Sequence, residues 1–168
     1  MFLNLLKNFF LKKNKRNTVT ANQSSHNENV AVLINMDSVT HVDQLKKILT
    51  TDIFPGKNIS FIDFKELPEK NITEGIPILS NKSFNWKAQL IDDWAVKQFE
   101  KPYNICLAFS KQNNYINKLA NITKARYKFE VSDTRNDIFD VSLIYSMSEN
   151  SDYIEGLKNY LKSFNLIN

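Results

Sequence analysis

The chain alternates between short, continuous apolar runs and segments in which apolar residues recur every three or four positions. The runs are rich in Val, Ile, Phe and Tyr, which favour strands. A run without polar alternation, such as the one at residues 30–34, is typical of a strand covered on both faces. Strands are therefore expected at residues 30–34, 59–64, 76–80, 103–109, 126–131 and 139–145.

Helical spacing of apolar residues predicts helices between and after these strands. Ser38 is expected to cap the first helix, and Asp92 or Asp93 the second. Further helices are expected around residues 115–122 and 151–164. Because parallel strands need crossover connections, the pattern predicts an α/β, Rossmann-like fold: a mostly parallel sheet with helices on both faces. An antiparallel pairing of the last strands at one edge stays open.

The first sixteen residues differ in pattern and are interpreted as a basic, amphipathic helix. Residues 17–28 are mostly Thr, Asn, Gln and Ser, which indicates a flexible polar tether. Residues 29–168 are expected to form a single α/β domain. The residues expected to dock on a membrane or a protein partner are Phe2, Leu5, Leu6, Phe9, Phe10, Lys12, Lys13, Lys15 and Arg16.

The positive charge of the chain is concentrated in this N-terminal arm. Five of the 22 basic residues lie within residues 1–16, where no acidic residue occurs, so 17 basic residues oppose 18 acidic ones in the remainder. The apolar stretch of the arm precedes the basic cluster, is interrupted by Lys7 and Asn8, and is shorter than the ~20 apolar residues that span a bilayer. We therefore expect a cytoplasmic protein, with the inner face of the membrane as a peripheral location.

Ligands of such folds bind beyond the carboxyl ends of the strands. The chain has only three glycines and none in the loop after the first strand, which argues against a dinucleotide fingerprint or a phosphate-binding loop. The polar side chains that could contact a ligand in the strand-end loops are Asp37, Asp133, Arg135 and Asp137, with Asp140 close to the last three. A solvated turn with a local ion pair explains the second group more simply than acid/base or cation-binding chemistry. We expect no catalytic residue, cofactor or metal site.

Three other features have simple structural explanations. Cys106 lies within an apolar strand, where an inert core cysteine is expected. His26 and His41 are too isolated to build a zinc site. The tripeptide Phe84-Asn85-Trp86 could stack on a planar ligand, but packing of its aromatic rings in the core is the simpler interpretation.

Several segments together resemble a family of short uncharacterised proteins of Bacteroidota over nearly the whole chain. They are the Phe, Leu and Lys residues of the arm, Phe84-Asn85-Trp86, Tyr103-Asn104-Ile105 and Ala125-Arg126-Tyr127-Lys128. The resemblance implies no activity and no catalytic residues. Residues 103–132 are also similar to the first domain of heptosyltransferase-like glycosyltransferases. The chain is too short for their second domain, so this likeness implies only the fold.

The sequence leaves several functions open. The first is a non-catalytic binding or adaptor protein whose N-terminal helix docks on an anionic membrane surface or in a groove of a protein partner. Packing of this helix on its own domain is almost as well supported. The second is a small-ligand-binding protein or enzyme that uses the strand-end loops. Association with ribosomal or other RNA is a weaker alternative, because the arm is more apolar than a phosphate-binding segment needs to be.

Overall fold

The computed structural model describes residues 29–39, 41–67, 78–145 and 152–167. The predicted N-terminal helix and tether, residues 1–28, lie outside these ranges.

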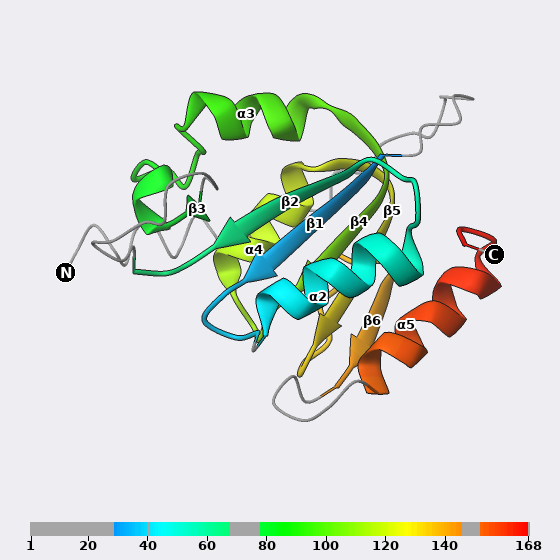
Figure 1. Cartoon of the computed structure of the whole chain (residues 1–168). Coiled ribbons are helices and arrows are strands. Elements are labelled where there is room, and N and C mark those ends of the chain that lie inside the picture. The colour runs from blue at the N-terminus through cyan, green and yellow to red at the C-terminus, as the bar shows by residue number, and fades with distance from the viewer. Residues whose placement is uncertain (1–28, 40, 68–77, 146–151, 168) are drawn as a thin grey trace.

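The described strands form a single six-stranded parallel sheet in the order β3-β2-β1-β4-β5-β6 (Figure 1). Every strand expected from the sequence is present, and the strand expected at the centre, β4, pairs with β1 in the middle of the sheet. The strands are β1 (Val30–Asn35), β2 (Ile59–Phe64), β3 (Ile78–Leu79), β4 (Pro102–Phe109), β5 (Lys124–Ser132) and β6 (Val141–Ile144). The sheet and its helices confirm the predicted α/β, Rossmann-like fold.

Helices cover both faces of the sheet, as the apolar periodicity predicts. One face carries α2 (Val42–Ile48), its π-helical continuation η1 (Leu49–Ile53) and α5 (Asp152–Ser163). The other face carries α3 (Asp93–Glu100) and α4 (Asn114–Ile122) (Figure 1). None of the helices in the described part of the chain is long and apolar enough to cross a membrane.

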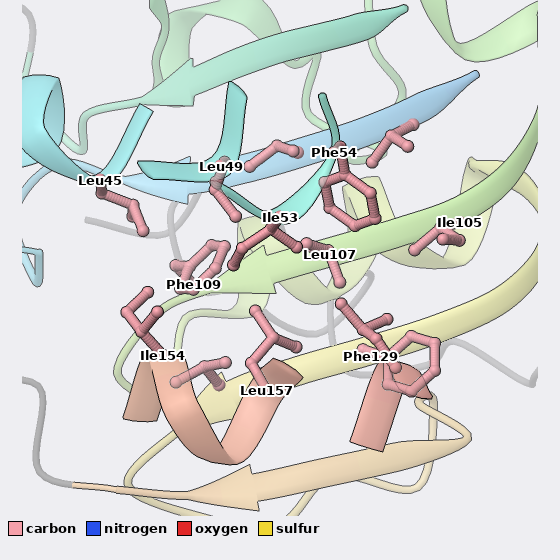
Figure 2. Packing of buried hydrophobic residues seen from close by; sticks show 14 of the residues in the cluster. Leu45, Leu49, Ile53, Phe54, Ile105, Leu107, Phe109, Phe129, Ile154 and Leu157 are labelled. Carbon is pink, nitrogen blue, oxygen red and sulfur yellow. The ribbon is translucent and has the colours of Figure 1, made fainter. Parts of the chain in front are cut away.

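Alternate residues of the central strands enter two separate cores. In β1, Val30, Val32 and Ile34 contact the core under α2 and α5, whereas Ala31 and Leu33 contact the core under α3 and α4. Figure 2 shows the first core, where side chains from the helices meet those of β4 and β5; the labelled residues are Leu45, Leu49, Ile53, Phe54, Ile105, Leu107, Phe109, Phe129, Ile154 and Leu157. This double burial explains why β1 has no polar alternation.

Strand β6 is parallel to β5, so an antiparallel edge pairing is wrong. The register pairs Val141 with Phe129, which requires the chain to return toward the amino end of β5 before β6 begins. Residues 133–140 make this return without a helix, and Phe139 is buried in the core under α3 and α4. The return is fixed to β5 because the Asp140 amide donates to the Lys128 carbonyl at 2.8 Å. A buried aromatic residue thus replaces the usual crossover helix.

The predicted cap of the first helix is also wrong. Helix α2 begins at Val42, and its N-cap is His41, whose φ of 58° lies in the left-handed region. Ser38 belongs instead to the turn after β1, where its hydroxyl accepts a hydrogen bond from Asn35 Nδ2 at 2.7 Å. Asp92 does precede α3, as expected, but its side chain makes no capping hydrogen bond.

Candidate functional site

The strand order places a topological switch point between β1 and β4. The chain moves outward from β1 to β2 and β3, then returns to β4 and moves outward in the opposite direction. In open parallel sheets the crevice beyond the carboxyl ends of the two switch strands is the usual ligand position. The loops that begin at Met36 and Ser110 flank this position. The carboxyl edge of the sheet is therefore the candidate site.

Hydrogen bonds within the protein already fix the loop after β1. Asn35 Oδ1 accepts from the Asp37 amide at 3.1 Å. The Asp37 carboxylate then accepts from the Glu66 amide at 2.7 Å and so ties the loop after β1 to the loop after β2. Asp37, predicted as a ligand contact, thus holds two strand-end loops together in this structure.

The loop after β4 leads directly into α4. Asn113 Oδ1 accepts from the Tyr115 and Ile116 amides at 2.8 and 3.1 Å and caps the helix. Ser110 is fully buried at the end of β4, and its Oγ has no hydrogen-bond partner among the described residues. In this loop, the Asn113 side chain is therefore engaged in capping α4, and the Ser110 hydroxyl is buried.

The other predicted contacts lie in the loop after β5. Asp133, Arg135 and Asp137 are exposed, and their side chains make no hydrogen bond or ion pair with the described part of the chain. Asp140 differs, because its Oδ2 accepts from the Lys128 amide at 2.8 Å. Since β4 separates the ends of β1 and β5, the structure does not gather Asp37 and the Asp133 group into one cluster.

Among the buried ionisable groups that sequence reasoning missed are Lys128 and Glu130, which lie on the same face of β5. The Lys128 ammonium donates to the Ala120 and Asn121 carbonyls, at 2.7 and 3.3 Å, at the carboxyl end of α4. A cation there interacts favourably with the helix dipole. The polar positions alternate with Tyr127 and Phe129, a pattern that ordinarily indicates a solvent-facing side. Only the tertiary structure shows that α4 and residues 133–140 cover this side.

Glu130 is the more unusual of the two. Its side chain is buried, with an exposed fraction of 2%, and Glu130 Oε2 accepts from the Ser142 hydroxyl at 3.2 Å. Burial raises the pKa of this carboxyl from 4.5 to about 7; the Ser142 hydrogen bond lowers it, and the nearby Asp133 charge raises it. A buried acid that titrates near neutral pH is a candidate functional group by electrostatics.

Cys106 and the Phe84-Asn85-Trp86 segment are expected to have structural roles, and the structure tests both. Cys106 is fully buried, and desolvation raises the pKa of its thiol to about 12, so it behaves as an inert core residue. Phe84 is buried and its ring centroid lies 5.1 Å from that of Tyr115, as a core interpretation requires. Trp86 is half exposed, with the Lys87 ammonium 5.0 Å from its ring centroid, so core packing is wrong for this ring.

The described residues hold no group of three or more His, Cys, Asp or Glu side chains that could bind a metal ion. Their fold and carboxyl edge define a doubly wound α/β protein with its switch point between β1 and β4. A family model, DUF6913, described as a family of unknown function, matches residues 4–164, and the chain belongs to this family. No curated protein and no solved structure matches the chain. The expected membership of an uncharacterised family is thereby confirmed.

Proposed function

We propose that this chain is a non-catalytic binding protein that docks on an anionic membrane surface through residues 1–16. The observation that carries the proposal is the sequence pattern of this arm, in which apolar residues at helical spacing are followed at once by a basic cluster. Apolar insertion and attraction to anionic lipid reinforce each other in such segments. The remaining residues carry a net charge of −1, so this arm is the part of the sequence best suited to an anionic surface.

The carboxyl edge of the sheet supports a binding role over a catalytic one. Asp37 and Asn113 hold a loop and a helix end through hydrogen bonds within the protein. General acid/base catalysis needs a side chain within hydrogen-bond reach of a bound substrate. Groups already engaged in loop geometry are poorly suited to that task.

Flotation with liposomes tests the membrane proposal. Full-length protein should float with vesicles that contain anionic lipid and should remain behind with neutral ones. A full-length variant carrying Leu6→Ser and Phe9→Ser should lose most of this binding, because two apolar anchors are removed. Asn4→Ser and Asn8→Ser together form the matched control on polar positions and should bind as the parent does. If the parent and the Leu6→Ser, Phe9→Ser variant bind anionic vesicles equally, the proposal is wrong. If the parent binds a protein partner but not vesicles, docking in a groove of that partner is favoured instead.

A second candidate function is binding of a small ligand at the carboxyl edge. The switch point between β1 and β4 favours it, together with the exposed and unengaged side chains of Asp133, Arg135 and Asp137. A ligand of the native state raises the unfolding temperature by mass action. Thermal unfolding with nucleotides, nucleotide sugars and divalent ions should then show an upward shift that Arg135→Gln or Asp137→Asn diminishes. A flat response across this panel would argue against the candidate.

A further inference from the structure

Glu130 lies in the interior of the sheet between two neighbouring strands. Its register partners are Ala108 on β4 and Ser142 on β6. The hydroxyl of Ser142 is its hydrogen-bond partner, and no Lys, Arg or His of the described ranges lies within salt-bridge distance of its carboxyl group. A buried carboxylate without a cation is strongly disfavoured, whereas a protonated carboxyl is tolerated. The geometry therefore selects the neutral acid for the closed structure.

The ionisable groups around Glu130 do not compensate a negative charge. On β5, Lys128 directs its ammonium to the carbonyls at the end of α4. On the same face of β4, Cys106 is a neutral thiol at physiological pH because burial raises its pKa to about 12. Residues 133–140 contribute Asp133, whose charge opposes ionisation of Glu130, and Asp140, which is bonded to the Lys128 amide. Arg135, the cation of this loop, is exposed.

The helix that covers this face adds no compensating charge. Helix α4 carries two titratable side chains, Tyr115 and Lys118. Tyr115 stacks on Phe64 of β2, with ring centroids 5.1 Å apart, and β1 and β4 lie between β2 and β5 in the sheet. Lys118 follows the buried Ile116 by two positions, about 200° around the helix axis, so it projects away from the sheet.

The structural element best able to respond to ionisation of Glu130 is β6. It has four residues and lies at the edge of the described sheet, where it pairs with β5. The strand also supplies Ser142, the hydrogen-bond partner of Glu130. Separation of β6 from β5 would expose Glu130 to water without disturbing the central pairs of β1 with β2 and β4. Edge elements of this kind are the ones that open at low free-energy cost.

We propose that Glu130 is a proton-operated clasp, whose neutral form holds β6 and residues 133–140 on the sheet and whose ionised form releases them. The inference goes beyond membrane docking and is independent of it. Loss of the proton from the carboxyl to solvent leaves a buried anion, and opening of the edge hydrates that anion. The edge of β5 and the freed loop then become increasingly available as the pH rises from about 4.5 through about 7.

Amide hydrogen exchange of the full-length protein, measured at several pH values, tests the clasp. The Glu130 carboxyl resonance should titrate with a midpoint near the value of about 7 given by its burial. With an open-state pKa of 4.5, linkage predicts that the opening equilibrium of β6 rises about tenfold from pH 6 to pH 8.5. Protection of the Val141–Ile144 amides, corrected for intrinsic exchange, should fall by that factor. Protection of β1 should stay above that of β6 at every pH, because β1 exchanges only when the whole fold opens.

Substitutions give the matched controls. Glu130→Gln should remove the pH dependence of β6 protection, while Asp137→Asn in the exposed loop should leave it as in the parent. Ser142→Ala should raise the Glu130 midpoint, and Asp133→Asn should lower it, because the first group favours the anion and the second opposes it. If Glu130→Gln does not fold, these two variants still decide the matter. A midpoint near 4.5, shifts of opposite sign, or β6 protection equal to that of β1 at every pH would overturn the proposal.

Discussion

Among single residues, Lys128 and Glu130 are unusual because they are ionisable side chains buried in the sheet. The sequence correctly predicts that Cys106 and residues 30–34 are buried, because their neighbours are apolar on both sides. Burial of Lys128 and Glu130 is not predicted, because alternation of polar and apolar residues in a strand indicates only that its two faces differ. Whether the polar face meets water depends on α4 and residues 133–140, which approach β5 only in the folded chain. Burial of Ser110 is not predicted for the same reason, because its enclosure depends on the loops around it.

Glu130 should make the stability of the whole fold pH-dependent. Its folded-state pKa is raised from 4.5 to about 7, so its favourable contribution is fully present below pH 4.5 and is lost as the pH rises through 7. In the Glu130→Gln variant, the free energy of unfolding measured with urea should therefore vary less with pH between pH 4.5 and 8. At pH 8 this free energy should be up to about 3 kcal/mol higher, relative to the parent, than it is at low pH. Unfolding free energies measured at pH 5 and pH 8 provide the check. If the difference in unfolding free energy between the parent and the variant is the same at pH 5 and pH 8, this assignment is wrong.

At the scale of elements, strands and helices follow from apolar periodicity, but their connections do not. The return of residues 133–140 to the level of Phe129 depends on burial of Phe139 under α4, a long-range contact with no local signal. The start of α2 is similar, because Asn35 competes for Ser38 and leaves the helix to begin after His41. In both places the contact that a side chain makes in the folded chain decides the course of the backbone.

Helix α5 offers a test of element packing at Gly156. A Cβ at this position would lie 2.6 Å from the Tyr145 hydroxyl oxygen, so Gly156→Ala forces the ring to move. In a helix interior, Ala is otherwise favoured over Gly by about 1 kcal/mol. In the parent, Gly156→Ala should thus raise the free energy of unfolding by less than this amount, or lower it. In a Tyr145→Ala background, the same substitution should raise it by about 1 kcal/mol. Urea unfolding of the four proteins of this cycle measures the coupling; additive effects would mean that the ring does not constrain the helix.

At the scale of the whole molecule, the sheet and the arm pose different problems of prediction. The α/β class follows from the alternation of elements, because parallel strands require the crossovers that the sequence displays. The position of a switch point follows only from the strand order, which one sequence does not encode locally. The candidate site could therefore be assigned to strand-end loops in general, but not to the edge between β1 and β4, nor to the enclosed carboxyl of Glu130.

Charge distribution separates membrane docking from RNA binding. Basic residues near an anionic membrane contribute about 1 kcal/mol each. Replacing Lys12, Lys13, Lys15 and Arg16 together by Gln should then weaken binding to anionic vesicles by up to about a thousandfold, while Phe9→Ala alone should also weaken it measurably. If RNA is the partner, the charge variant should abolish binding and its steep salt dependence, and Phe9→Ala should matter little, because phosphate contacts act through counterion release. Vesicle flotation and filter binding of RNA at two salt concentrations distinguish these outcomes.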